Sequence, residues 1–162
     1  EHLIENGCRN IAMLSGKKTA QVSERRECGY RRALEKHGLH IREEWIEDCL
    51  FDQKTAVQKS IELKKSYPEI DAFFCVSDGV AIGAIEGMGQ LGVRVPDDVA
   101  IAGFDDYTVS QYIHGGITSI KQYPYKMGVA CANTVISMIE GNRVPDWIPM
   151  EYKLMKRAST KK

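Results

Sequence analysis

The sequence contains no long hydrophobic run and no excess of either charge. No window approaches the roughly 18 consecutive apolar residues of a membrane span, so we predict no membrane contact. The 22 basic and 22 acidic residues give a formal net charge of +0, whereas a module that holds DNA by itself usually carries a basic excess. We therefore expect any contact with DNA to lie in a part of the protein that this chain does not contain.

The chain also lacks paired cysteines, an initiator methionine and a signal peptide. Its cysteines are scattered without a C-x-x-C pair, which is typical of free thiols in a reducing compartment such as the cytoplasm. Residues 1–7 have the pattern of the end of a helix closed by Gly7, so we expect that an N-terminal part of the protein is missing. The composition of 43% hydrophobic and 27% charged residues is ordinary for one globular domain. The cysteines are Cys8, Cys28, Cys49, Cys75 and Cys131.

The motifs of several enzyme and cofactor classes are missing as well. There is no G-x-S-x-G nucleophile elbow, and no serine or cysteine has a convincing base nearby in the sequence. Residues 87–92 match G-x-G-x-x-G, but they lie at the end of a predicted helix and not at the strand-to-helix turn that a dinucleotide needs. Residues 37–40 read H-G-L-H and lack further metal ligands nearby. Asp105 and Asp106 are neighbours on one loop and cannot flank a glycosidic bond. We predict no catalytic residue, no metal site and no cofactor.

The hydrophobic pattern alternates short apolar runs with helical segments, and capping residues and glycines mark the helix ends. This alternation predicts βαβ units and an α/β fold: a doubly wound, mainly parallel sheet with helices on both faces. Ser23 and Asp78 are the expected N-caps of two helices. The expected strands cover residues 10–14, 45–51, 71–76, 99–104, 117–121 and 150–155, and the expected helices cover residues 23–37, 54–66, 78–91 and 125–140.

Polar side chains follow most of the predicted strands. In an open α/β sheet, ligands bind outside the carboxyl ends of the strands. Carboxylates and amides there exchange hydrogen bonds with hydroxyl groups, and an aromatic ring stacks on the apolar face of a sugar or a base. The pattern therefore predicts a site for a carbohydrate or a nucleobase. The residues at the strand ends are Ser15, Gly16, Phe51, Asp52, Ser77, Asp78, Asp105, Asp106 and Gln122.

These residues also have simpler structural interpretations. Asp78 can be simply the N-cap of a helix, with no contact to a ligand. Asp105 and Asp106 can form a solvated turn. Phe51 can be a core residue at a strand end. Arg26, inside a predicted helix, is by its pattern a surface arginine.

Six short motifs follow one another along nearly the whole chain. The most specific is V-P-D-D-V-A-I-A-G-F-D-D at residues 95–106, and E-R-R-E-C-G-Y at residues 24–30 and D-A-F-F-C-V-S-D at residues 71–78 are further examples. Together the motifs resemble the lactose/galactose-repressor family of bacterial transcription regulators. The other stretches are H-L-I-E-N-G-C-R-N-I-A at residues 2–12, I-T-S-I-K-Q at residues 117–122 and L-M-K-R-A-S-T at residues 154–160.

The resemblance implies one lobe of a periplasmic-binding-protein-like type I fold, in which a small effector lies in a cleft between two lobes. It implies that Arg26 and Asp105 grip the effector, that an aromatic ring near Phe51 stacks on it, and that Gln122 lies at the cleft near a lobe crossover. The family commonly has a ligand-binding asparagine where this chain has Ser77. The predicted ligand-binding residues are Arg26, Phe51, Ser77, Asp78, Asp105 and Gln122.

The resemblance also implies how the chain is divided. We interpret residues 1–162 as an effector-binding and dimerisation domain, mainly the C-terminal lobe. The segment 123–145 would return to a first lobe that is missing. Two further departures from the family pattern are Gly115-Gly116, where a proline often precedes the crossover strand, and Cys8, which replaces a usual histidine.

Two functions remain open at this stage. The first is the core of a cytoplasmic repressor that responds to a sugar, a sugar derivative or a purine. The second is an exported sugar-binding protein of a transporter with the same fold. The unpaired cysteines and the tail at residues 154–160 favour the repressor. An enzyme on the same kind of sheet is a third option, which no motif supports.

The resemblance predicts a homodimer. We expect the helix at residues 79–91, together with the helix that ends at Gly7, to form the interface. The reasoning is that Ala81, Ile85 and Met88 cannot all be buried within one lobe, so that some should contact a partner.

Overall fold

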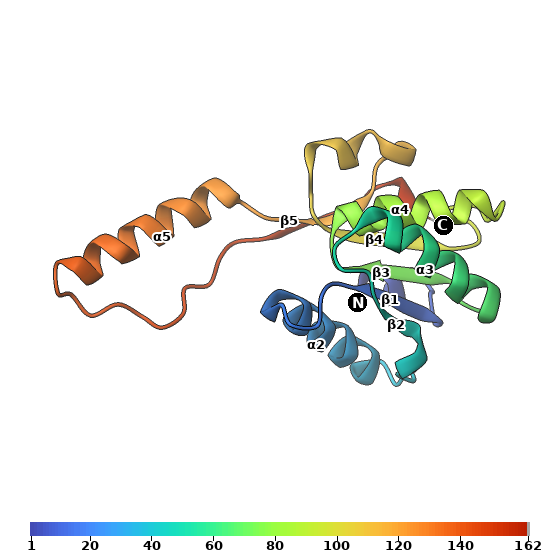
Figure 1. Cartoon of the computed structure of the whole chain (residues 1–162), viewed down its shortest axis with the longest axis horizontal. Helices are drawn as coiled ribbons and strands as arrows, with labels where there is room; N and C mark the ends of the chain where they lie inside the picture. The colour runs from blue at the N-terminus through green and yellow to red at the C-terminus, as the bar shows by residue number, and fades with distance from the viewer. Residues whose placement is uncertain (162) are drawn as a thin grey trace.

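The structure, a computed structural model that describes residues 1–161, is built on one six-stranded sheet (Figure 1). The strand order is β2-β1-β3-β4-β5-β6. All neighbouring strands pair in parallel except β5 and β6, which are antiparallel. The predicted doubly wound, mainly parallel sheet is therefore confirmed. The strands are β1 (Ile11–Ser15), β2 (Ile46–Asp48), β3 (Ala72–Cys75), β4 (Ala100–Asp105), β5 (Thr118–Lys121) and β6 (Lys153–Met155).

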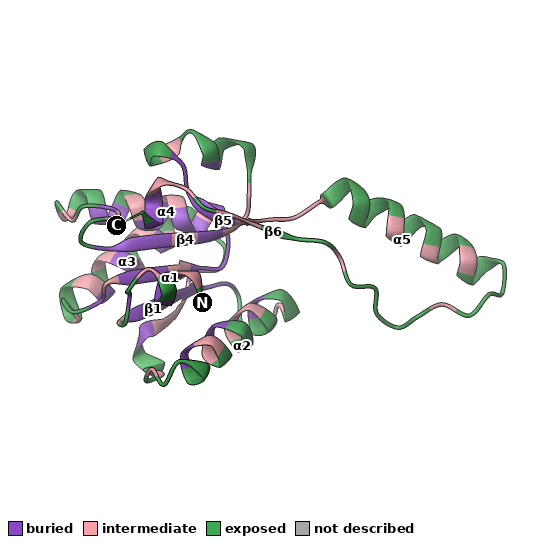
Figure 2. Ribbon diagram, turned by 180° about the vertical axis from the view of Figure 1, so that it is seen from behind, coloured by how far each residue is buried: buried purple, intermediate pink, exposed green. Residues whose placement is uncertain are grey.

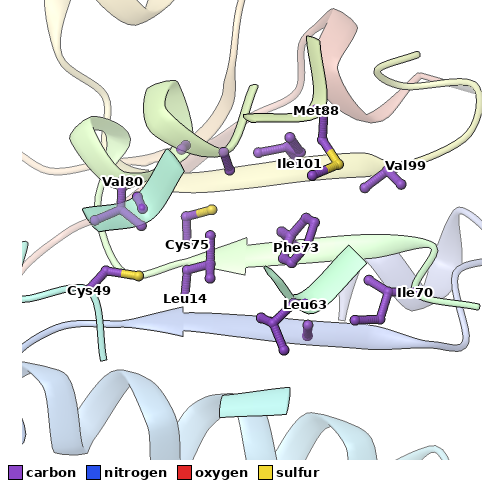
Figure 3. Close-up of a cluster of buried hydrophobic side chains, with 14 of the residues drawn as sticks. Leu14, Cys49, Leu63, Ile70, Phe73, Cys75, Val80, Met88, Val99 and Ile101 are labelled. Atoms are coloured by element: carbon purple, nitrogen blue, oxygen red, sulfur yellow. The ribbon is translucent and has the colours of Figure 1, made fainter. Parts of the chain in front are cut away.

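Helices cover both faces of the sheet, as the alternating pattern predicts. One hydrophobic core lies between the sheet and the helices α3 and α4, and Figure 3 shows part of it, with Phe73, Met88 and Ile101 packed together. A smaller core lies on the other face beneath α1 and α2, where Tyr30 stacks on Phe74. The α-helices are α1 (His2–Glu5), α2 (Gln21–Lys36), α3 (Gln53–Ser66), α4 (Asp78–Gln90) and α5 (Pro124–Ile139). Short 3-10 helices are η1 (Glu43–Trp45), η2 (Thr108–Gln111), η3 (Ile113–Gly115) and η4 (Ala158–Thr160).

The order of the strands reverses next to β1. From β1 the chain crosses to β2 on one side, and after α3 it returns to β3 on the other side. In doubly wound sheets, the carboxyl ends of the strands at such a reversal border a crevice in which ligands bind. The site predicted at the strand ends therefore lies where the topology opens the sheet.

Two predicted helix caps are wrong in detail. Helix α2 begins at Gln21, after Ala20, and Ser23 is a buried residue of its first turn whose Oγ has no hydrogen-bond partner among the described residues. The N-cap of α4 is Ser77, whose Oγ accepts a hydrogen bond from the backbone N–H of Val80 at 3.3 Å. Asp78 is the first residue of the helix, so its carboxylate is free for other contacts.

The predicted strand at residues 45–51 is also too long. Trp45 ends the 3-10 helix η1, and β2 stops at Asp48. Leu50 and Phe51 have left-handed backbone conformations, with φ of 53° and 58°, which a strand cannot contain. Phe51 therefore lies on a turn and not at a strand end. The predicted strand at residues 150–155 is likewise shorter, since β6 begins at Lys153.

Helices α3 and α4 approach each other closely because α4 carries glycines on its inner face. A methyl group at Gly83 would lie 2.4 Å from the carbonyl oxygen of Gln53, and one at Gly87 would lie 2.3 Å from Ser60 Oγ. The G-x-G-x-x-G match at residues 87–92 thus lies at the end of a helix, as expected. Its first glycine serves helix packing.

Replacing Gly83 by alanine is expected to destabilise the fold by about 1–3 kcal/mol, because the backbone of α3 blocks the added methyl group. Gly89→Ala is the matched control, since that glycine lies on the same helix with no atom within 4 Å of an added Cβ. It should stabilise the protein by roughly 0.5–1 kcal/mol through the lower entropy of the unfolded chain. Urea unfolding measures both, and wild-type stability of Gly83→Ala would show that the two helices can separate freely.

The argument that placed α4 in a dimer interface is wrong for two of its residues. Ala81 and Met88 are fully buried in the core of this chain, against α3 and the sheet. Ile85 is only partly buried at the edge of that core, as is Ile82. One lobe is therefore large enough to bury most of the apolar face of α4.

The last described residues return to the sheet and close its end. Ser159 Oγ accepts a hydrogen bond from the N–H of Thr118 at 2.8 Å and donates one to the carbonyl of Ile101 at 2.6 Å. Thr160 Oγ1 lies 2.7 Å from Thr118 Oγ1 and 2.9 Å from His2 Nε2. This buried polar network accounts for the serine and the threonine of the motif at residues 154–160.

Helix α5 lies apart from the rest of the molecule. Figure 1 shows it at the end of two extended segments that leave the sheet after β5 and return to β6, and Figure 2 shows its exposed surface. None of its residues is buried, although Val135, Ile136 and Ile139 are apolar and at least half exposed. No helix of the described chain is long and apolar enough to cross a membrane.

Candidate functional site

The candidate site centres on Arg26, which points from α2 toward the carboxyl ends of β3 and β4. One nitrogen of its guanidinium donates to the carbonyl oxygen of Val76, and Nη2 lies 3.2 Å from Asp105 Oδ1 in an ion pair. The guanidinium carbon also lies 3.8 Å from the centre of the Phe104 ring. An arginine held by a carbonyl, a carboxylate and an aromatic face is fixed in direction, and so it is not the ordinary surface residue of the simpler interpretation.

Asp105 brings further polar groups to Arg26. Its Oδ1 accepts a second hydrogen bond from Gln122 Nε2 at 2.6 Å, and its carboxylate interacts with the Tyr107 hydroxyl. The residue ends β4 with a left-handed φ of 108°, and Asp106 follows with a φ of 56°. Asp106 is not solvated either, because its Oδ1 lies 2.6 Å from Arg157 Nη2. The simpler interpretation of this pair as a solvated turn is therefore wrong.

Burial shapes the electrostatics of this group. It raises the pKa of Asp105 above its ordinary value, and the positive charge of Arg26 offsets only part of that shift. Burial also lowers the pKa of Arg26, which nevertheless stays charged as arginines in proteins do. The negative charge of Asp105 raises the pKa of Tyr107 and keeps its hydroxyl protonated. The two charges thus balance each other. Arg26 also donates to the carbonyl of Val76, and Asp105 also accepts from Gln122. The side chains of Arg26 and Asp105 remain 12% and 15% exposed.

Ser77 and Asp78 lie beneath this group and are both buried. Ser77 is occupied as the cap of α4. The Asp78 carboxylate accepts hydrogen bonds from the backbone N–H of Tyr107 and from the hydroxyls of Ser110 and Ser119. The structure therefore places both residues near the carboxyl ends of the strands, as predicted, but their polar side-chain atoms form hydrogen bonds within the protein.

Phe51 lies on the turn after β2. Its ring packs over the turn after β1, where a methyl group at Gly16 would meet it at 2.3 Å. Among the contacts of the described residues, none joins Phe51 to Arg26, Asp105 or Gln122. Phe51 as a whole is 37% exposed.

The sequence reasoning missed Phe104 and Tyr107. Phe104 precedes Asp105 in the motif at residues 95–106, and Tyr107 comes directly after that motif. The strand-end rule could have selected Tyr107 as an aromatic residue on the loop after β4. By its pattern, Phe104 is only a residue of a predicted strand. Its role as a platform for Arg26 depends on α2 lying across that strand.

Two hollows adjoin the site. A groove of about 1360 Å³ runs over the face of the sheet beside α2 and reaches Arg26, Phe104 and Gln122. A smaller hollow of about 330 Å³ lies near the start of α5 and is lined by Phe104, Gln122 and Tyr152 among others. Residues 1–161 contain no group of three or more histidine, cysteine, aspartate or glutamate side chains placed to hold a metal ion.

The arrangement can bind a neutral ligand that has several hydroxyl, amide or ring-nitrogen groups. Arg26 and Gln122 supply donors, Asp105 supplies an acceptor, and the Tyr107 hydroxyl can do either. Phe104 and Tyr107 supply apolar ring surface nearby. Three of the six predicted ligand-binding residues, Arg26, Asp105 and Gln122, are thus in direct contact.

Comparison with known proteins places this geometry in a family. The model of the periplasmic binding protein-like domain matches residues 1–160. The HTH-type transcriptional repressor PurR of Actinobacillus pleuropneumoniae is 29% identical over 164 residues, which cover 99% of this chain and 49% of that protein. The chain therefore spans about half the length of the curated relatives that it matches.

Similar solved structures support the same family assignment. The transcriptional regulator CelR in complex with cellobiose has 34% sequence identity and a TM-score of 0.92, covering 97% of this chain and 48% of that one. A regulatory protein of the LacI family from Chloroflexus aggregans has 28% identity and a TM-score of 0.90, covering 98% of this chain and 57% of that one. The resemblance to the lactose/galactose-repressor family is thereby confirmed.

Proposed function

The chain belongs to the periplasmic binding protein-like domain family, and from this premise we propose that it is the effector-sensing and dimerising part of a bacterial transcriptional repressor. The observation that carries the proposal is the group formed by Arg26, Asp105 and Gln122 at the carboxyl ends of the strands. Such a set of directed donors and acceptors beside an aromatic ring suits recognition of a small polar molecule.

A sugar or sugar derivative is the effector class that we propose. The cellobiose complex of CelR, which has 34% identity to this chain, supports a sugar. A purine is the alternative, because a nucleobase also presents ring nitrogens and N–H groups to these donors and acceptors. In either case Arg26 donates to the ligand, Asp105 accepts from its hydroxyl or N–H groups, and Gln122 orients the carboxylate. We assign Ser77 and Asp78 to the support of the site.

The wider role follows from the same relatives. Since they are transcriptional regulators, we propose a cytoplasmic protein without enzymatic activity that contacts operator DNA through a module outside these residues. The formal net charge of +0 supports a DNA contact outside these residues, because DNA-binding modules usually carry a basic excess. The repressor interpretation is favoured over an exported sugar-binding protein because the matched proteins are regulators.

A thermal-shift screen of the full-length protein against sugars, sugar acids and purine bases tests the proposal. A ligand that binds only the native state raises the unfolding temperature as its concentration exceeds its dissociation constant. A hit that disappears in an Arg26→Ala variant, with a Arg94→Ala variant as a surface control, would support the site. If no compound of these classes shifts the transition, the proposed effector class is wrong.

We place the dimer surface on the loop between β4 and β5 and the outer side of α4. Val109 and Tyr112 on this loop are 48% and 79% exposed, and Ile82 and Ile85 on α4 are only partly buried. A set of exposed apolar side chains of this kind is typical of an interaction surface. This proposal replaces the earlier expectation that Ala81 and Met88 contact the partner.

Tyr112→Asp is expected to convert the dimer into a monomer, because a carboxylate would lose its hydration at the centre of an apolar interface. Sedimentation velocity over a range of protein concentrations measures the change. Leu50→Asp is the matched control, since Leu50 is 57% exposed on the turn after β2 at the far edge of the sheet. A Tyr112→Asp protein that remains dimeric would place the interface elsewhere.

A further inference from the structure

The fully buried carboxylate of Asp78 is a feature that ligand binding alone does not explain. The residue has no exposed surface, and none of the ion pairs found among residues 1–161 includes it. Its charge is balanced instead by donors of the protein, and it begins α4, where the helix N-terminus favours an anion. A buried charge held in this way is costly unless every partner is in place, so the partners indicate what the residue does.

All three partners belong to segments that form the ligand site. Asp78 Oδ2 accepts from the backbone N–H of Tyr107 at 2.9 Å and from Ser110 Oγ at 2.6 Å, both on the loop after β4. Asp78 Oδ1 accepts from Ser119 Oγ on β5 at 2.6 Å. Ser119 Oγ in turn accepts from the backbone N–H of Asp106 at 3.0 Å. Asp78 thereby holds the two successive amides that follow Asp105, one directly and one through a serine.

The backbone at this point needs such support. Asp105 and Asp106 both have positive φ angles, of 108° and 56°. Aspartate tolerates the second of these, whereas the first is rare for an L-residue and persists when the surroundings over-determine it. If the amides of Asp106 and Tyr107 were released, the loop could relax to ordinary angles. The carboxylate of Asp105 would then turn away from Arg26 and Gln122.

The rest of the local sequence makes room for this arrangement. Gly103 on β4 faces Asp78, and a methyl group there would lie 2.3 Å from Asp78 Oδ1. Ser77 caps α4, which leaves the carboxylate of Asp78 available to the loop. Ser77 thus caps the helix, Asp78 binds the loop, and Gly103 leaves room for the Asp78 carboxylate.

We propose that Asp78 is a positioning residue, which fixes the strained loop at residues 105–107 and so aims Asp105 and Tyr107 into the ligand site. It acts through the backbone and through Ser119, without touching the ligand. The inference rests on the proposed function for its biological meaning. The geometry itself can be tested without a ligand.

The test is amide hydrogen exchange of the 162-residue chain by NMR, in the wild type and in Asp78→Ala. Loss of the carboxylate leaves the amides of Asp106 and Tyr107 without their anchor, and their exchange should accelerate at least roughly tenfold, equivalent to about 1.4 kcal/mol. Asp78→Asn should retain most of the protection, because its amide oxygen can still accept from Tyr107 and its NH2 can donate to Ser119. Ser119→Ala should release Asp106 more than Tyr107.

Gly87→Ala separates positioning from general loss of stability, because it disturbs the same helix where α4 packs on α3. It should not selectively affect the two loop amides. A second readout is the NMR titration of the Asp105 carboxyl carbon. The pKa of Asp105 should fall in Asp78→Asn and Asp78→Ala, since the negative charge of Asp78 helps to raise it, and it should not move in Gly87→Ala.

Full protection of the Tyr107 and Asp106 amides in Asp78→Ala would overturn the proposal. This outcome would be independent of the effector screen. Conversely, a failed screen together with released amides would refute the proposed effector class and leave the positioning role of Asp78 supported.

Discussion

The full-length protein that contains this chain is expected to bind its effector several hundredfold more tightly than the 162-residue chain does. A small-molecule site usually buries 70–90% of its ligand. In the site that we propose, Arg26, Asp105 and Gln122 form one wall, while α5 has no buried residue and stands apart from the sheet. An affinity at the micromolar level corresponds to about 8 kcal/mol, and loss of about 3–4 kcal/mol with the opposite wall would move it toward millimolar.

Calorimetry on both proteins with the compound found in the screen measures this difference. The chain should first be shown to be folded by circular dichroism, so that weak binding is not a result of unfolding. Equal affinities for the two proteins would mean that the site is complete within these 162 residues. The apolar side of α5 would then need another role than packing against a second lobe.

The second large effect is expected for Asp105→Ala in the full-length protein, which should weaken effector binding by about 2–3 kcal/mol, or roughly 30–150-fold. The substitution removes the acceptor of the site and leaves the charge of Arg26, whose side chain is only 12% exposed, without its carboxylate partner. It also releases Gln122, whose Nε2 donates to the same oxygen. Both remaining donors would be free to turn from the ligand.

Because alanine is disfavoured at a φ of 108°, the stability of the variant has to be measured beside its affinity. Asp105→Asn keeps the size of the side chain and tolerates this backbone angle better, and it should still weaken binding. Asp97→Ala is the control, as an exposed carboxylate with an ion pair to Arg94. If both Asp105 variants bind the effector normally, the site has been placed wrongly.

Features of the fold that depend on residues close together in the sequence could be predicted well. The alternation of apolar runs and helices, the end of α4 before Gly92 and the start of α5 near Pro124 follow from periodicity, glycine and proline, each of which acts over a few positions. Asp105 and Gln122 could be selected because each follows a strand, and parallel strands bring their carboxyl ends to one edge. Arg26 could not be selected in this way, since its partner lies 79 residues away in the chain, and the family resemblance had to supply it.

What the tertiary structure decided is which polar group each side chain meets. Local propensity allows either Ser77 or Asp78 to cap α4, and the donors of Tyr107, Ser110 and Ser119 draw the aspartate into the core. The left-handed turn at Phe51 moves that ring over Gly16, and close contact with α3 buries the face of α4 expected to meet a partner. The sequence by itself thus determined the main elements, their order and the edge of the sheet at which we propose the site. The roles within the site depend on contacts between distant segments, which exist only once the strands and helices have packed.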